Sequence, residues 1–400
     1  MYGKKVFVII KTIALFMCVV FLSSCKNTQG NSDLGIDQFQ VDFSAGTGGK
    51  ITASFEGGQE TNKSPLTVEK DKILTFKAKA DSGYEIGKWS ITGGTFEANT
   101  GTEENETAKV KVNAKVEVKV KFQPTVELPE LKSFTVNGVT FNMRIIKAVD
   151  ANLGSNSKDD NKEHTIKLSE YCIGETEVTQ GLWQAVMGNN PSYFSDNPAL
   201  GEEQSMRPVE NVSWFDCIAF CNELTKKLNN GSDSKCVYFS DPGGSNPYTK
   251  EDAKSNNPCY APSFALGGFR LPTEAEWEWA AKGGKSYKYC GTDNADNLVE
   301  YAWYGLNSMN QTHEVKKKKM NGYGLYDMNG NVWEWCWDWY GPIPSNTRPN
   351  YKGANFGTHR ILRGGCWMTR DATDAEVANR DYGYPYTNDG KDAGFRLVCK

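Results

Sequence analysis

The chain has few of the residues from which transition-metal and redox sites are built. It contains three histidines, which lie far apart, and none of its eleven cysteines forms a Cys-x-x-Cys pair. A zinc site is therefore disfavoured. Nine cysteines follow residue 25, and their odd number and spacing leave both disulfides and buried free thiols open.

The sequence also has no strong charge of one sign. Its formal net charge is -4, with acidic and basic residues interspersed, so no basic field could hold nucleic-acid phosphates. We expect no nucleic-acid partner. Aromatic residues are plentiful instead, at 12% with 11 tryptophans, and so are glycines, at 39. This composition is typical of a loop-rich extracellular protein that contains β-structure.

The N-terminal 25 residues have the features of a secretory signal. Lys4 and Lys5 precede an apolar stretch over residues 6–21, which is short for a membrane-spanning helix. The stretch ends in Leu-Ser-Ser-Cys, the spacing of a bacterial lipobox, and Cys25 is the predicted lipidation site. An ordinary signal peptide with a chance cysteine is the alternative. Residues 26–35 read as a flexible tether, so we expect a lipoprotein anchored to the bacterial outer membrane and exposed at the surface.

Residues 36–123 alternate apolar and polar side chains with a period of two, which predicts a small all-β domain. Within it, the sequence SGYEIGKWS at residues 82–90 resembles the divergent InlB B-repeat, a β-grasp-like spacer module of bacterial surface proteins. Residues 124–132 contain two prolines and form the predicted linker, because proline stiffens a connection and does not join a sheet ladder.

Two helices can be predicted in the second domain, residues 133–400. Ser213 is an expected N-cap, and residues 214–228 place Cys217 and Cys221 on one apolar stripe, where packing is favoured over metal binding. Thr273 is the expected N-cap of a second helix, which the Gly-Gly pair at residues 283 and 284 ends.

Six strings in this second domain together resemble the formylglycine-generating-enzyme (sulfatase-modifying factor) family. They are GETEVTQGLWQAVMG (174–188), RPVENVSWFDCIAFCNEL (207–224), FRLPTEAEWEWAAKGG (269–284), NGYGLYDMNGNVWEWCWDWY (321–340), RILRGGCW (360–367) and GFRLV (394–398). The resemblance implies an α+β, C-type-lectin-like fold for residues 133–400. Fold alone does not decide function, so the site residues must be compared one by one.

In the catalytic members of the family, two cysteines hold copper(I). The corresponding positions here are Thr369 and Asp374, which lack the soft thiolate that copper(I) requires. Cys366 stands in the place of a family serine and cannot form the pair alone. We therefore expect no enzyme activity and no catalytic cofactor. The family's structural calcium site corresponds to Asp327, Gly330, Val332 and Glu334. Hydrogen bonding of this turn without a metal is the alternative.

Between Trp367 and Gly394 the sequence differs in character from this framework, and the face over residues 360–398 resembles the variable region of retroelement-diversified surface proteins, among them phage tropism determinants and treponemal variable lipoproteins. In those proteins, diversification alters adenines of the coding sequence. An Asn codon altered at its two adenines gives Asp, Tyr, Thr, Gly, Ala, Ser or Arg, which are the residue types found here. Met368 does not arise from Asn in this way.

Tyrosine offers rigid contact area, and small polar residues adapt their hydrogen bonds, as in antibody loops. The expected ligand-binding residues are Cys366, Met368, Thr369, Arg370, Asp371, Asp374, Asp381, Tyr382, Gly383, Tyr384, Tyr386, Thr387 and Asp389.

These features predict a surface lipoprotein with a β spacer and a non-catalytic, diversified face that binds a macromolecular ligand, expected to be a protein. An ordinary strand with tyrosines on one side is the plain alternative for the face. A structural envelope lipoprotein or adaptor with a fixed binding surface is the alternative function. An active formylglycine-generating oxidase is less favoured, and carbohydrate binding is weak because no EPN- or QPD-type motif is present.

Overall fold

The computed structural model describes residues 37–56, 58–102, 105–344, 348–387 and 390–400. The chain divides into two compact units, and the boundary in the sequence lies between Thr125 and Val126. Cys25 and the predicted tether lie outside the described residues. Within the described part of the chain, no helix is long and apolar enough to cross a membrane.

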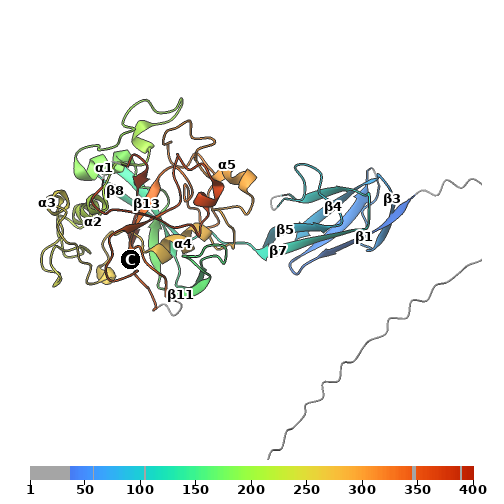
Figure 1. The fold of residues 1–400 in the computed structure, drawn as a ribbon, viewed down its shortest axis with the longest axis horizontal. Coiled ribbons are helices and arrows are strands. Elements are labelled where there is room, and N and C mark those ends of the chain that lie inside the picture. Colours follow the sequence, from blue (N-terminus) through green and yellow to red (C-terminus); the bar gives the residue numbers. More distant parts are fainter. Residues whose placement is uncertain (1–36, 57, 103–104, 345–347, 388–389) are drawn as a thin grey trace, which may run out of the picture. The chain divides into compact units, whose positions relative to one another are not determined.

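The first unit is a sandwich of two β-sheets (Figure 1). One sheet has the strand order β3-β1-β7-β5 and the other β2-β4-β6. Alternate residues of both sheets point inward and form one apolar core, in which Phe43 and Phe76 pack edge to face at 5.6 Å. The strands are β1 (Gln38–Ala45), β2 (Gly49–Phe55), β3 (Leu66–Glu69), β4 (Ile73–Ala80), β5 (Tyr84–Thr92), β6 (Thr107–Lys111) and β7 (Val116–Pro124).

The predicted all-β character of this unit agrees with the structure, but the arrangement differs from a β-grasp. Its described residues include no helix, and the second sheet covers the apolar face that a helix would cover in a β-grasp. Trp89 of the InlB-like string is buried in this core, and its indole N–H donates to the Asn105 carbonyl. Pro124 was expected in the linker. It is the last residue of β7, where a missing N–H costs little.

The second unit combines short strands, short helices and long loops, and its α+β class is as predicted. Its sheets have the orders β17-β12-β9-β8, β10-β11 and β15-β14-β13-β16. The strands are β8 (Leu131–Val136), β9 (Val139–Ile146), β10 (Val149–Leu153), β11 (His164–Leu168), β12 (Tyr171–Gly174), β13 (Trp333–Trp339), β14 (Arg360–Arg363), β15 (Asp381–Gly383), β16 (Ala393–Gly394) and β17 (Val398–Cys399). The helices are α1 (Gln180–Met187), α2 (Trp214–Leu228), α3 (Lys250–Lys254), α4 (Glu274–Lys282) and α5 (Leu298–Tyr301), with 3-10 turns η1 (Gln204–Met206), η2 (Phe264–Leu266), η3 (Ala295–Asn297) and η4 (Ala372–Ala375).

Both predicted helices are confirmed with their caps. Ser213 and Asp216 form a capping box at the start of α2, and Thr273 and Glu276 form another at the start of α4. Gly283 ends α4 in the left-handed conformation. Helix α2 lies beside α1 (Figure 1), where Trp183 stacks on Phe220 at 5.0 Å.

The cysteines of the second unit pack as free thiols. All nine described cysteines are unpaired, and all but Cys259 are buried. Burial raises the pKa values of the Cys217 and Cys221 thiols well above their ordinary range, which keeps them protonated and unsuited to metal binding. Among the described residues, no group of three or more His, Cys, Asp or Glu side chains is placed to hold a metal ion.

Candidate ligand-binding face

The exposed face is organised around β15, an edge strand of the sheet β15-β14-β13-β16. Tyr382 lies on β15 and Tyr384 directly follows it, and the two rings share a side because both contact His359. Tyr386 stacks on Tyr384 with ring centroids 5.4 Å apart. The three side chains are 48%, 46% and 53% exposed, respectively. Large aromatic side chains this exposed contribute little to folding and are available to a ligand.

Two residues outside the predicted set extend these tyrosines into a row. His359 lies 4.9 Å from Tyr382 and 4.1 Å from Tyr384, measured between ring centroids, and Tyr340 lies 4.5 Å from Tyr382. We call Tyr340, Tyr382, His359, Tyr384 and Tyr386 the aromatic row. Sequence reasoning missed His359 and Tyr340 because they precede or end family motifs and join the row only through the pairing of β14 with β13 and β15.

Gly383 belongs to the opposite side of β15, contrary to its place in the expected set. A Cβ atom at this position would lie 2.5 Å from Cη2 of Trp335 and 3.3 Å from Cδ1 of Leu362. Both neighbours are buried in the core. Gly383 therefore allows β15 to lie against Trp335 and has no side chain to offer a ligand.

Cys366 and Thr369 are also removed from the expected face. They are 2% and 8% exposed, and they fix the turn after β14 by bonding each other. The Cys366 N–H donates to Thr369 Oγ1 at 2.9 Å, and the Thr369 N–H donates to the Cys366 carbonyl at 3.0 Å. Burial raises the pKa of the Cys366 thiol to about 12. Both residues are structural because this turn packs against the core.

The remaining predicted residues of this segment reach solvent. Met368, Arg370, Asp371 and Asp374 are exposed. Asp371 also caps η4, because its carboxylate accepts the Thr373 N–H at 2.9 Å.

The other predicted positions lie on β15 and in the turn after it. Asp381 is half-buried, and burial raises its pKa. Thr387 is half-buried and donates from its hydroxyl to the Tyr384 carbonyl at 2.9 Å. Asp389 lies outside the described residues.

Buried ion pairs hold the backbone beneath the face. Arg380, directly before β15, donates to both carboxylate oxygens of Glu274 at 2.7 and 2.9 Å. Arg363, the last residue of β14, donates to Glu278 at 2.7 Å and to the Val377 carbonyl at 2.7 Å. Bidentate and multiply bonded arginines fix geometry as well as charge. The exposed side chains therefore stand on a rigid support.

The side chains at the positions expected to correspond to the family's copper ligands do not suit copper(I). Thr369 is buried and uses its hydroxyl within the turn, whereas Asp374 is exposed on η4. The nearby Cys366 is a protonated thiol at neutral pH. Copper(I) prefers soft thiolate ligands, and these three side chains offer none.

The expected calcium residues lie in a buried, acidic region. Asp327 Oδ2 accepts the Lys316 N–H at 2.9 Å, whereas its Oδ1 is buried without a hydrogen-bond partner in the described structure. Burial, above all, raises the pKa of Asp327 to about 6 and that of the nearby Glu177 well above its usual value. A hard cation would use this oxygen and offset the charge.

Glu334, the second predicted carboxylate ligand, already has partners. It accepts hydrogen bonds from Arg396 at 2.6 Å on each oxygen and from the Trp277 indole at 2.7 Å. A calcium ion held by Asp327, Glu334 and the backbone oxygens of Gly330 and Val332 stays a prediction, and the unpartnered Asp327 Oδ1 is the observation in its favour.

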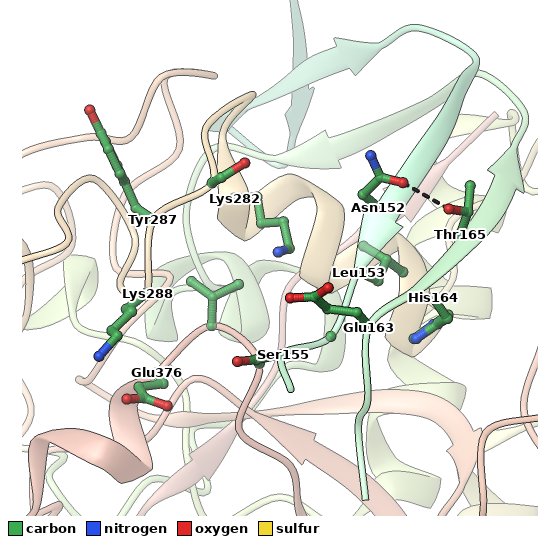
Figure 2. A pocket seen from close by; sticks show the side chains of 14 residues that line it. Asn152, Leu153, Ser155, Glu163, His164, Thr165, Lys282, Tyr287, Lys288 and Glu376 are labelled. Atoms are coloured by element: carbon green, nitrogen blue, oxygen red, sulfur yellow. Dashed lines mark hydrogen bonds between the residues drawn. The ribbon is translucent and has the colours of Figure 1, made fainter. Parts of the chain in front are cut away.

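A polar pocket of about 450 Å³ opens between β10, β11, the end of α4 and the segment after η4 (Figure 2). Asn152 and Thr165 face each other across β10 and β11 and are joined by a hydrogen bond of 2.8 Å. Lys282, Lys288 and Glu376 also line it. Glu376 pairs with Lys158 at 3.1 Å, so opposite charges largely cancel around this pocket and it shows no bias toward one charge of ligand.

Comparison with known proteins agrees with the motifs. A family model described as the sulfatase-modifying factor enzyme 1-like domain matches residues 121–400. The solved structure of Treponema denticola variable protein 1 is 48% identical, with a TM-score of 0.62, and the match covers 68% of this chain and 99% of that one.

Curated relatives include both non-enzymes and enzymes by name. The chaperone protein LppX of Paenibacillus barcinonensis is 36% identical over 268 residues, which is 60% of this chain and 84% of that protein. The formylglycine-generating enzyme of Streptomyces coelicolor is 29% identical over 264 residues, 59% of this chain and 80% of the enzyme. The chain belongs to the sulfatase-modifying factor (formylglycine-generating-enzyme) family.

Proposed function

We propose that this protein is a surface-exposed lipoprotein that presents a non-catalytic, diversified face to a protein ligand. The observation that carries the proposal is the aromatic row. Its tyrosines are about half exposed, and in the described structure the hydroxyls of Tyr382, Tyr384 and Tyr386 make no hydrogen bond. Tyrosines arranged in this way are frequent anchors of protein recognition.

The absence of catalysis is supported by the residues at the copper positions. Thr369 and Asp374 replace the two cysteines, and Cys366 is buried and protonated. Similarity to the treponemal variable protein supports a variable surface role.

Anchoring is proposed from the lipobox at Cys25, and a lipid at that position would hold the protein on the outer membrane. The InlB-like unit would then serve as a spacer.

The test is the nucleotide sequence of codons 360–400 across sibling clones, with a search for a near-identical template copy nearby. We expect differences at template adenines, and we expect the varying codons to be those of exposed side chains, namely codons 370, 371, 374, 382, 384 and 386. Codons for Cys366, Thr369 and Gly383 should stay restricted, because their side-chain positions are buried. An invariant segment without a template would overturn the proposal and favour a fixed envelope adaptor.

A further inference from the structure

A second hollow of about 540 Å³ lies next to the aromatic row. Tyr340 belongs to both, because it lines the hollow and contacts Tyr382 at 4.5 Å. Pro342, Ile343 and Pro344 continue its wall, and residues 159–164 form the opposite side. We call it the proline pocket. A ligand that covers the aromatic row would pass directly over its mouth.

The charges of the proline pocket are predominantly negative. Asp159, Asp160 and Glu163 line it together with Lys162, and Lys162 pairs with Asp159 at 2.8 Å. Asp160 accepts the Tyr340 hydroxyl at 3.1 Å, and its carboxylate lies 3.9 Å from Nη1 of Arg380. In the described structure, no hydrogen bond or ion pair involves the Glu163 carboxylate, which is exposed.

The arginine of the pocket does not reverse this balance. Arg380 packs against the Tyr340 ring, with its guanidinium carbon 4.9 Å from the ring centroid. Its charge is matched by the bidentate bond to Glu274 and by the Asp160 carboxylate, which lies 3.9 Å from Nη1. Nη1 also donates to the Asp160 and Gly341 carbonyls. A carboxylate or phosphate entering the pocket would therefore meet the exposed Glu163, whose carboxylate has no ion-pair partner in the described structure.

We propose that the proline pocket receives a lysine or arginine side chain of the protein ligand. The inference rests on the proposed function and deepens it by stating which chemistry the ligand carries beside its contact with the tyrosines. Tyr340, Pro342 and Ile343 provide apolar surface for the methylene groups of such a side chain. Glu163 attracts its charged end, and the lining as a whole has more acidic than basic side chains.

The test uses the full chain in detergent and two fluorinated peptides, trifluoroacetyl-Gly-Arg-Gly-amide and the same peptide with citrulline. Citrulline has nearly the shape of arginine but no charge. Binding is followed by fluorine NMR at low and high salt. We expect millimolar affinity for the arginine peptide and roughly fivefold weaker binding of the citrulline peptide, as for a partly exposed ion pair. The difference should shrink at high salt.

Three variants locate the effect. Glu163→Gln should weaken binding of the arginine peptide about threefold, and Lys162→Gln should strengthen its binding because Asp159 loses its ion-pair partner. Glu203→Gln is the matched control, because it removes an exposed carboxylate of the same unit outside the pocket, and it should change nothing.

The inference would be overturned if the arginine and citrulline peptides bound equally well, or if the arginine peptide bound the Glu163→Gln variant as tightly as the parent protein. Either result would count whatever the codon sequences show. An invariant codon segment with charge-selective peptide binding would overturn the proposed function and leave the pocket standing.

Discussion

The inward position of Gly383 gives the sharpest prediction about how the face can vary. In Gly383→Ala, the new methyl group would start 2.5 Å from Cη2 and 3.2 Å from Cζ3 of Trp335. Trp335 is 2% exposed, and its indole N–H donates to the Val212 carbonyl at 3.1 Å. The ring therefore has little freedom to move away.

The expected change in stability follows from two opposing effects. Overpacking a buried site costs about 1–3 kcal/mol, whereas replacing glycine at an ordinary backbone angle returns about 0.4–1 kcal/mol by restricting the unfolded chain. We expect Gly383→Ala to lower the free energy of unfolding by roughly 1–2 kcal/mol, and Gly383→Asn to lower it further because Asn is larger and polar.

Denaturant unfolding followed by tryptophan fluorescence measures this, and it reports chiefly on the second unit because Trp89 is the single tryptophan before residue 126. The control is Tyr384→Ala, which changes an exposed neighbour on the other side of the chain. Its free energy of unfolding should stay within about 0.5 kcal/mol of that of the parent protein. A Gly383→Ala protein as stable as the parent would refute the reasoning and return this position to the variable set.

Three further predictions concern the framework. Burial, above all, raises the pKa of Asp338 from 3.8 to about 8. Between these pH values the folded protein holds a proton that the unfolded chain releases, so the free energy of unfolding should fall as pH rises from about 4 to 8. Asp338→Asn should flatten that part of a pH series of denaturation curves, and a parallel curve would contradict it. The guanidinium carbon of Arg360 lies 3.7 Å from the Trp214 ring centroid and 3.5 Å from that of Trp339. Arg360→Lys should lower the free energy of unfolding by about 2 kcal/mol, because an ammonium group cannot stack on the rings as a planar guanidinium does. An unchanged unfolding midpoint would contradict the stacking. Calcium should raise the melting temperature relative to EGTA through Asp327, and Asp327→Asn should abolish the difference; equal melting with and without calcium would exclude the metal.

Features that depend on neighbours in sequence could be predicted well. The capping boxes of α2 and α4 use residues three apart, so Ser213 and Thr273 were identifiable from the sequence. The shared side of Tyr382 and Tyr384 agrees with their spacing of two residues, which is the period of an extended chain. The calcium and copper positions required family motifs, since the spacing of Asp327 and Glu334 alone does not specify a metal.

Features that depend on distant pairing could not be predicted in this way. Residue type suggested that Cys366, Thr369 and Gly383 belong with the exposed set, because cysteine, threonine and glycine occur both in binding loops and in tight turns. Their burial is decided by the turn after β14 and by Trp335, which lies 48 positions before Gly383. His359 joined the tyrosines for the same reason, through the pairing of β14 with β15.

The separation of exposed and buried positions explains how one scaffold could tolerate many faces. The tyrosine side chains of the row make contacts with one another and with His359, whereas β15 is held by its pairing with β14 and by the Arg380–Glu274 bond directly before it. Replacing Tyr384 or Tyr386 therefore removes surface without removing a bond that the framework needs. Replacing Arg380 would remove the bidentate partner of the buried Glu274 and leave Arg363, 3.6 Å away, as its ion-pair partner in the described structure, at a cost of about 3 kcal/mol. The proposed diversity would consequently be confined by energetics to the exposed side of β15.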